Sequence, residues 1–201
     1  TLTLQLASGL GSSFDTAIGI RSSCAGTQTC SNDACATPQS QLVQNLALGT
    51  YYLVVNGATA GASGSFVLDI EHLPVGTDGT MRLLVPAGVS GTTSGPSVLG
   101  GSCGGAMAPE HTYYWTRCPS AAAGAFIASS CSTGTNYNSL LYALSGPLGT
   151  ELGCNDDIAC GPRPQASQLS VPVDAGAGLY ALYVDGAGSQ AGNYFVTSTL
   201  P

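Results

Sequence analysis

Positive charge is almost missing from this chain of 201 residues, which has no lysine and only four arginines. Charged residues of both signs make up 7% of the chain, whereas about 25% is usual in soluble domains. The formal net charge is −7, and a surface of that sign repels nucleic acid and anionic membranes. We therefore expect no nucleic-acid partner.

Long apolar runs and helical patterns are missing too. No run approaches the roughly 18 apolar residues that a membrane-spanning helix needs, so we expect no membrane insertion. No stretch combines the helical period of about 3.6 residues with capping residues. The chain lacks a CxxC motif, and its two histidines, His72 and His111, are not spaced from cysteines as in zinc sites. These absences disfavour helical, membrane-spanning and zinc-binding architectures.

Cysteine, in contrast, is plentiful. Eight cysteines without metal-site spacing predict disulfides, and disulfides indicate an oxidising compartment. We therefore expect a secreted protein of the extracellular space or the cell surface. The predicted disulfide residues are Cys24, Cys30, Cys35, Cys103, Cys118, Cys131, Cys154 and Cys160.

Two pairings are suggested by the order of the cysteines and the predicted strands. Cys103 precedes one predicted strand and Cys131 ends its expected antiparallel neighbour, so these two are expected to pair. Cys154 and Cys160 would close the acidic stretch between them. Cys118 is then left over, together with one cysteine of the first half. Those two would pair with each other, or one of them would bridge two chains.

Short strand patterns separated by glycine, serine and threonine fill the chain. Residues 2–6 alternate apolar and polar side chains with a period of two, which is typical of a half-buried strand. Segments of the first half recur in the same order in the second half, which predicts two copies of one all-β unit. The matched segments are 2–6 with 124–129, 16–21 with 139–144, 30–35 with 154–160, 41–46 with 168–173, 49–57 with 178–186, and 64–68 with 192–196.

The predicted fold is all-β, with two tandem jelly-roll-like β-sandwich domains, the first lacking its N-terminal strand or strands. The expected domains span 1–72 and 91–201. Between them, residues 73–90 form a predicted linker, because proline and glycine punctuate this stretch. Within it, residues 81–85 form a possible strand.

The two copies differ at their beginnings. Copy two opens with a leader at 102–110 and a strand at 111–116, and copy one lacks both. A sandwich without an edge strand exposes unpaired backbone groups, which favours pairing with another strand. Three sources of that strand are open: residues 81–85, a strand of another chain, or sequence preceding Thr1.

Several motifs occur in a characteristic order: Ser102-Cys103-Gly104-Gly105 with Ala108-Pro109-Glu110, Phe14-Asp15-Thr16, Cys154-Asn155-Asp156-Asp157, and the paired endings at 51–57 and 63–66. This arrangement resembles the bacterial pre-peptidase C-terminal (PPC-like) domain over nearly all of copy two and about two thirds of copy one. The resemblance implies a secreted, non-catalytic β-sandwich attached to proteases, other exoenzymes or surface proteins. Some members of that family bind calcium through acidic loops.

A calcium ion is the cofactor that the acidic residues suggest, because calcium takes about six to eight oxygen ligands. In the alternative interpretation, the same side chains accept hydrogen bonds from backbone N–H groups in tight turns. The candidate ligands are Asn155, Asp156, Asp157 and Glu110, with Asn138 as a further choice, in copy two, and Asp15, Asp33 and Asn32 in copy one.

Two arrangements have the outline of a catalytic motif. Residues 100–104 match G-x-S-x-G around Ser102, but that motif needs a following helix and a distant histidine, and His111 is only nine residues further on. Glu110 with Asp156 and Asp157 could form a glycosidase pair, but no sugar-binding cleft is predicted around them. We therefore expect no enzyme.

The function expected from these features is binding or assembly. A surface rich in small, uncharged residues packs against neighbours at little desolvation cost. We expect a non-catalytic extracellular structural protein, a subunit of a filament or surface layer, or an adhesin, with strand complementation between subunits as one mechanism. Its partners would be further copies of the chain, other extracellular proteins or polysaccharide. The alternative is an accessory binding module of a secreted protease or other exoenzyme.

Overall fold

The computed structural model describes residues 2–8, 12–26, 28–33, 38–73, 75–80, 82–104, 107–118, 121–160, 163–176 and 178–201. Their regular structure consists of the strands β1 to β16, which confirms the all-β prediction. None of these residues forms a helix that could cross a membrane.

The chain divides into two compact units. Unit 1 comprises Thr1–Pro74, Arg117–Ala121 and Ala175–Gly178, and unit 2 comprises Val75–Thr116, Ala122–Asp174 and Leu179–Pro201.

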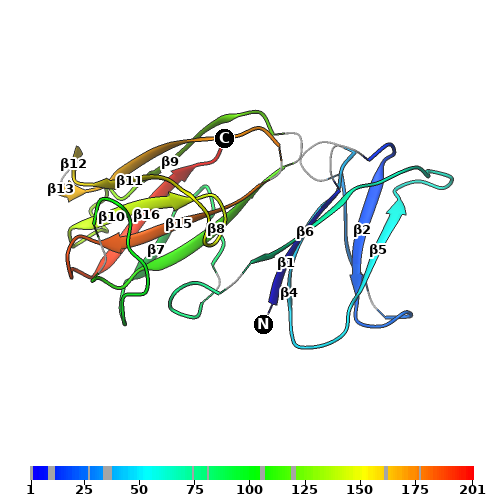
Figure 1. The fold of residues 1–201 in the computed structure, drawn as a ribbon, viewed down its shortest axis with the longest axis horizontal. Helices are drawn as coiled ribbons and strands as arrows, with labels where there is room; N and C mark the ends of the chain where they lie inside the picture. Colours follow the sequence, from blue (N-terminus) through cyan, green and yellow to red (C-terminus); the bar gives the residue numbers. More distant parts are fainter. Residues whose placement is uncertain are drawn as a thin grey trace. The chain divides into compact units, whose positions relative to one another are not determined.

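Unit 2 is a sandwich of two four-stranded sheets, ordered β14-β9-β16-β7 and β11-β10-β15-β8 (Figure 1). A two-stranded ribbon, β12-β13, extends from it. The strands are β7 (Val89–Thr92), β8 (His111–Arg117), β9 (Gly124–Ser129), β10 (Ser139–Leu144), β11 (Glu151–Asp156), β12 (Ile158–Cys160), β13 (Arg163–Ala166), β14 (Gln168–Val173), β15 (Gly178–Gly186) and β16 (Asn193–Thr199).

The core of unit 2 lies between its two sheets. On β14 every second side chain is buried, as expected for a strand with one solvent-facing side. Trp115 of β8 stacks between Phe126 of β9 and Tyr180 of β15, with ring centroids 4.0 Å and 5.1 Å away. Offset stacks of this kind stabilise a core beyond the area that they bury.

Unit 1 has two three-stranded sheets, ordered β4-β1-β6 and β3-β2-β5 (Figure 1). Its core is small and contains Ile18 and Ile20 from one sheet and Leu42 and Leu46 from the other. The strands are β1 (Leu2–Ser8), β2 (Thr16–Arg21), β3 (Gln28–Asn32), β4 (Gln41–Leu46), β5 (Tyr52–Gly57) and β6 (Leu68–Leu73).

The six strands of unit 1 repeat six strands of unit 2 in order and in register. β1 to β6 correspond to β9, β10, β11, β14, β15 and β16. Cys30 lies opposite Gly19, just as Cys154 lies opposite Tyr142. The other strand pairs agree in the same way. Between β2 and β5, Thr16 lies opposite Gly57, as Ser139 lies opposite Gly186 between β10 and β15. Ala7 of β1 lies opposite Gln41 and Asp69, as Ser129 of β9 lies opposite Gln168 and Thr197.

β7 and β8 have no counterpart among the described residues of unit 1. The predicted strand at 81–85 does not take that place. Leu83 forms a parallel bridge with Tyr114 of β8, and the N–H of Leu84 donates to the carbonyl of Tyr114 at 2.8 Å. This segment therefore extends a sheet of unit 2. In the described part of unit 1, β5 and β6 are edge strands, whereas their counterparts β15 and β16 each lie between two strands, and we call these two the open edges of unit 1.

Candidate functional site

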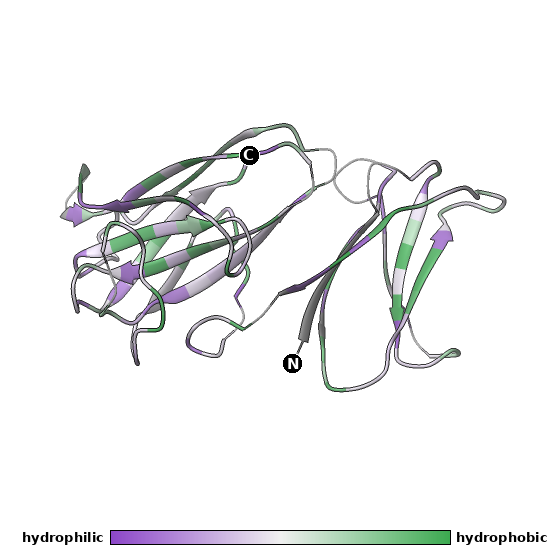
Figure 2. Ribbon diagram, viewed as in Figure 1, coloured by the Kyte–Doolittle hydropathy of each residue, from purple (hydrophilic) through white to green (hydrophobic). Residues whose placement is uncertain are grey.

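The first open edge of unit 1 is β5. In unit 2 the corresponding strand, β15, lies between β10 and β8, and every residue after Gly178 is buried. β5 ends its sheet, and its side chains are exposed or half-buried. Tyr52 is 44% exposed, whereas Ala181 at the same register position is 0% exposed. Figure 2 shows that β5 is mostly hydrophobic despite this exposure.

The inward face at β5 carries the same residues as the inward face of β15. Tyr51, Leu53 and Val55 occupy the positions of Tyr180, Leu182 and Val184. In unit 2 all three side chains are buried in the core, but in unit 1 they are only half-buried. In unit 2 these positions have β8 beside them in the same sheet, whereas β5 has no neighbouring strand on that side among the described residues.

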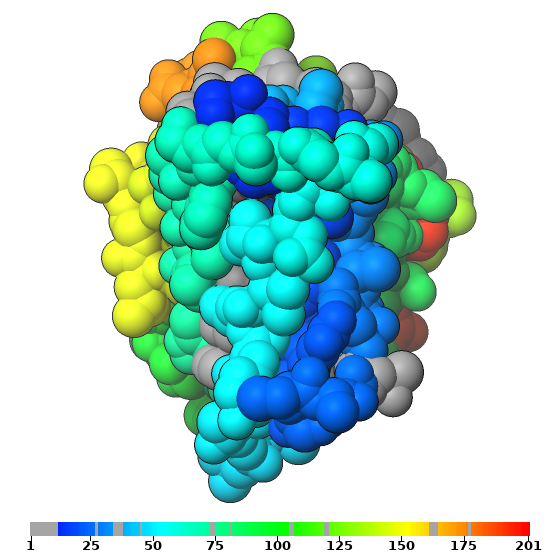
Figure 3. All heavy atoms as spheres, turned by 90° about the vertical axis from the view of Figure 1, so that its right-hand side faces the viewer, coloured from blue at the N-terminus to red at the C-terminus, as the bar shows by residue number. Residues whose placement is uncertain are grey.

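The second open edge is β6, which corresponds to β16 and, within the described part of unit 1, lacks the neighbour that β7 provides there. Phe66, just before β6, is 49% exposed, whereas its counterpart Tyr194 is 1% exposed. Ile70 on β6 is 51% exposed. Figure 3 shows the side of unit 1 that carries β5, whose atoms, in cyan, lie at the surface. Apolar side chains are therefore exposed along both open edges.

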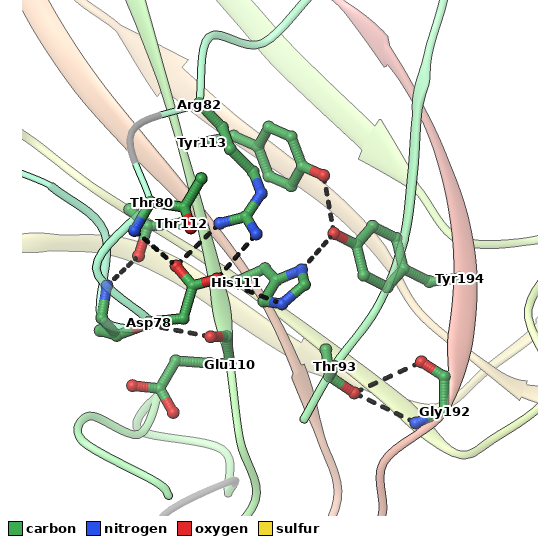
Figure 4. A network of polar contacts seen from close by, with 11 residues as sticks. Asp78, Thr80, Arg82, Thr93, Glu110, His111, Thr112, Tyr113, Gly192 and Tyr194 are labelled. Carbon is green, nitrogen blue, oxygen red and sulfur yellow. Dashed lines mark hydrogen bonds and ion pairs between the residues drawn. The ribbon is translucent and has the colours of Figure 1, made fainter. Parts of the chain in front are cut away.

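Unit 2 contains a network of polar side chains that joins the segment before β7 to β8 and β16 (Figure 4). Arg82 binds Asp78 through both terminal nitrogens, at 2.8 Å and 2.7 Å. Nε2 of His111 lies 3.6 Å from the same carboxylate, and its Nδ1 lies 2.7 Å from the hydroxyl of Tyr194. The hydroxyl of Tyr113 is 2.6 Å from that of Tyr194.

The charges of this network are matched within it. The hydrogen bonds from Arg82 lower the pKa of Asp78 to about 2, so Asp78 is ionised at neutral pH. Burial, reinforced by the charge of Arg82, lowers the pKa of His111, which keeps the ring neutral. The contacts follow the Asp–His–Tyr order of a catalytic relay, but His111, Tyr113 and Tyr194 are buried. The network therefore fixes the residues around Asp78 and Arg82 against β8.

A second structural feature of unit 2 is the covering segment, residues 97–104 and 107–110, which lies over the outward face of the sheet that contains β10 and β15. Glu110, buried at the end of this segment, accepts hydrogen bonds from the backbone N–H groups of Val98 and Leu99 at 2.8–3.3 Å. Beneath the segment, the rings of Tyr142 and Tyr183 stack 4.6 Å apart. Glu110 therefore has a structural role here, because its carboxylate closes a loop.

The side chains of the predicted calcium ligands Asn155 and Asp156 of unit 2 do not point to the same side of their strand. Asn155 and Asp156 are successive strand residues, so their side chains lie on opposite faces of β11. Oδ1 of Asn155 accepts the backbone N–H of Gln168 at 2.9 Å. Asp157 is exposed and has a φ of 50°, and its counterpart Asp33 has a φ of 54°. Both aspartates thus occupy the left-handed turn position that the alternative interpretation assigns to such residues.

In unit 1 the structure does bring Asp15 and Asp33 together. Partial burial and the adjacent Asp33 raise the pKa of Asp15. In neither unit do the described residues contain a group of three or more His, Cys, Asp or Glu side chains that could hold a metal ion. Calcium binding stays a prediction from the sequence.

Sequence reasoning missed one acidic residue as a site candidate. Asp185 is fully buried on β15, and burial raises the pKa of its carboxyl to about 7. Its Oδ1 accepts the N–H of Gly186 at 2.7 Å, while its Oδ2 has no hydrogen-bond partner among the described residues, and neither has Oδ1 of Asn138. One sequence signal could have pointed to this residue: copy two has Asp185 where copy one has Asn56.

The disulfides correct the predicted pairing. Cys103 binds Cys154, and Cys131 binds Cys160. The predicted pairs Cys103–Cys131 and Cys154–Cys160 are wrong because Cys154 is not part of a loop. It lies within β11, where strand alternation directs its side chain towards the covering segment, and the chain reverses only after Asp156.

The remaining cysteines divide into bonded and free. Cys118 is disulfide-bonded. Cys24 and Cys30 are exposed free thiols, so their prediction as disulfide residues is wrong. Cys30 is the counterpart of Cys154, but unit 1 has no covering segment to supply a partner among its described residues. The predicted disulfide residue Cys35 lies outside the described residues.

The G-x-S-x-G match does not form a nucleophile elbow. Ser102 lies in an exposed turn, where both its backbone N–H and its hydroxyl donate to the carboxylate of Glu151. A strand–turn–helix context would be required, and the turn instead leads on through the covering segment to β8.

Comparison with protein-family models and with curated protein sequences finds no match for the chain. The PPC-like resemblance therefore remains a prediction. The disulfides Cys103–Cys154 and Cys131–Cys160 are consistent with an oxidising, extracellular environment.

Proposed function

We propose that this chain is a non-catalytic structural protein of the cell exterior that assembles through β-strand addition to unit 1. The observation that carries the proposal is the open edge at β5. Tyr51, Leu53 and Val55 are half-buried there, whereas their counterparts on β15, which has β8 as a further neighbour, are buried in the core. An added strand gains backbone hydrogen bonds along the edge and apolar contacts on one face.

Charge and composition support the same function. Natural proteins protect sheet edges with charged side chains, lysine above all, with proline or with bulges. β5 carries no charged residue, whereas β6 carries Asp69 and Glu71. Neither β5 nor β6 contains a proline, and apolar residues are exposed along both. A strand added to one chain by another links subunits head to tail, which produces filaments when the rotation does not close.

Light scattering over a range of protein concentrations tests the proposal. The wild-type chain is expected to associate, and the double variant Tyr52→Lys with Ile70→Lys is expected to remain monomeric. Both side chains are already about half exposed, so the added charges oppose strand addition with little effect on the fold of a single chain.

Leu148→Lys is the matched control, because Leu148 is an exposed apolar residue in a turn of unit 2, away from β5 and β6 in the strand order. It should associate like the wild type. A wild-type chain that stays monomeric at every concentration would contradict the proposal, as would equal loss of association in the control.

A further inference from the structure

Three oxygen-bearing side chains of unit 2 share one face and one end of the sheet β11-β10-β15-β8. Asp156 of β11 and Asp185 of β15 lie opposite the same residue of β10, Leu140. Asn138 precedes Leu140 by two residues, so strand alternation places its side chain on the same face. Its carbonyl accepts the N–H of Ala187 at 3.0 Å, which continues the pairing of the two chain segments to that point. An amide on the central strand thus has one carboxylate on each neighbouring strand.

Each of the three side chains has a buried oxygen that lacks a hydrogen-bond partner among the described residues: Oδ1 of Asn138, Oδ1 of Asp156 and Oδ2 of Asp185. Asp185 is 0% exposed and Asn138 is 8% exposed. A buried oxygen without a donor is costly, and a buried carboxylate without a counter-charge costs more. These three atoms therefore mark a place where a partner is missing.

The missing partner has to carry positive charge. In the described part of the chain, neither Asp156 nor Asp185 forms an ion pair with an arginine or a histidine. Two further carboxylates add negative charge nearby, since Glu110 interacts with Asp185 and Asp157 interacts with Asp156. A cation at the three unpartnered oxygens would offset this charge.

Unit 1 keeps the same arrangement with the carboxylate and the amides exchanged. Asn32 and Asn56 lie opposite Ala17, the counterpart of Leu140, and Asp15 precedes Ala17 by two residues. The carboxylate of Asp33 adjoins that of Asp15 and gives unit 1 a second negative charge at this place. Both units thus have an aspartate or an asparagine at all three positions, and at least two carboxylates around them.

The apolar residues on the same face are not kept between the units. Leu140, Tyr142 and Tyr183 of unit 2 correspond to Ala17, Gly19 and Val54 of unit 1. Packing on this face has therefore changed, while the three oxygen-bearing side chains have stayed. Aspartate and asparagine share a side-chain oxygen at the same distance from the backbone, and that oxygen is what a metal ion would use.

We infer that Asn138, Asp156 and Asp185 bind a calcium ion in unit 2. All three donors are oxygen atoms, which calcium takes in irregular sets of about six to eight, with backbone carbonyls and water completing them. Neighbouring strands lie about 4.8 Å apart, and ligands from three strands suit calcium better than the smaller magnesium ion, which demands a near-ideal octahedron. Of the ligands predicted from the sequence, this set keeps Asp156 and the further choice Asn138, and adds Asp185.

The ion is assigned to unit 2 alone. In unit 1 the side chains of Asn32 and Asn56 are exposed, so water satisfies their oxygens. The site is also independent of strand addition, because its three residues lie in unit 2 and the open edges lie in unit 1.

Calcium titration of the full chain, first stripped of metal ions with EDTA, tests the inference at about pH 8. Extracellular calcium modules bind with Kd values of about 10⁻⁴–10⁻³ M, so about 10 mM calcium should lower the unfolding equilibrium constant of unit 2 by roughly ten- to a hundredfold. Magnesium at the same concentration should lower it by less than about threefold. Hydrogen exchange resolved by segment should slow in Ser139–Leu144 and Gly178–Gly186 on addition of calcium.

Two variants identify the ligands. Asp185→Asn keeps the size of the side chain and removes its charge, so it should fold without calcium yet bind the ion at least about tenfold more weakly in isothermal titration calorimetry. Asp69→Asn is the matched control, because it removes an exposed carboxylate from unit 1, and it should bind calcium like the wild type.

A wild-type chain whose stability is the same in EDTA and in calcium would overturn the inference and assign the three oxygens to buried water. An equal loss of calcium affinity in both variants would also overturn it, since the ion would then follow the overall charge of the chain. Neither result affects the light-scattering test of strand addition.

Discussion

Cys30 and Cys154 occupy the same register position in the two units, yet Cys154 is bonded to Cys103 and Cys30 is an exposed free thiol. The difference follows from the covering segment, which carries Cys103 and has no counterpart among the described residues of unit 1. This difference between the units accounts for the unbonded Cys30.

Thiol labelling checks this assignment. Iodoacetamide added to the folded chain without reductant should modify Cys24 and Cys30, because both thiols are exposed. Peptide mapping by mass spectrometry should find Cys103, Cys131, Cys154 and Cys160 unmodified until reductant is added. Protection of Cys30 together with labelling of Cys154 would contradict the assignment.

The Cys103–Cys154 disulfide should stabilise unit 2 by anchoring the covering segment. Replacing both cysteines by serine is expected to lower the free energy of unfolding by about 2–4 kcal/mol, since the bond closes a long loop. Cys30→Ser is the matched control and should change the stability of unit 1 by less than about 0.5 kcal/mol, because its thiol is exposed and unbonded. Equal losses in chemical denaturation would show that the disulfide has no special role.

Asp185 should make the stability of unit 2 depend on pH when no metal ion is bound. Burial raises its pKa in the folded state to about 7, above its ordinary value of 3.8, so the folded state binds more protons between those values. Its favourable contribution is therefore complete below about pH 4 and is lost as the pH rises through about 7. Asp185→Asn should remove this loss and be the more stable protein at pH 8 by about 1–3 kcal/mol.

Asn56→Asp introduces the same carboxylate at the matching position of unit 1, where the side chain is exposed. It should leave the pH dependence unchanged. A wild-type chain whose denaturation midpoint is the same at pH 5 and pH 8 would contradict the burial argument for Asp185.

The two matched tyrosines should differ in their contribution to stability. Tyr180→Ala removes a buried ring that stacks on Trp115, and a loss of about 3–5 kcal/mol is expected in unit 2. Tyr51→Ala removes a half-buried ring, and a loss of about 1–2 kcal/mol is expected in unit 1. Hydrogen exchange resolved by segment gives both values, and equal losses would show that β5 is as well covered as β15.

The strand repeat could be predicted from the sequence because strand alternation and turn residues are local signals. Gln41 and Gln168, for example, each open a strand of the same pattern, and they prove to occupy one register position. The disulfide pairing could not be predicted, since it depends on which face of β11 carries Cys154. The burial of Asp185 was likewise hidden, because it depends on packing between residues distant in the sequence, as its interaction with Glu110 shows. The role of Glu110 was missed for the same reason: its partners are backbone N–H groups, which carry no sequence signal.

The most direct test of the account is hydrogen exchange of β5 and β15 in the monomeric chain, followed by the same measurement in the presence of a peptide with the sequence of residues 111–117. We predict rapid exchange in Tyr52–Gly57 and slow exchange in Gly178–Gly186, because β15 has a strand on both sides and β5 on one. The peptide should slow exchange in β5 and leave β15 unchanged. Equal protection of the two strands in the monomer, unaltered by the peptide, would contradict the claim that unit 1 has an open edge.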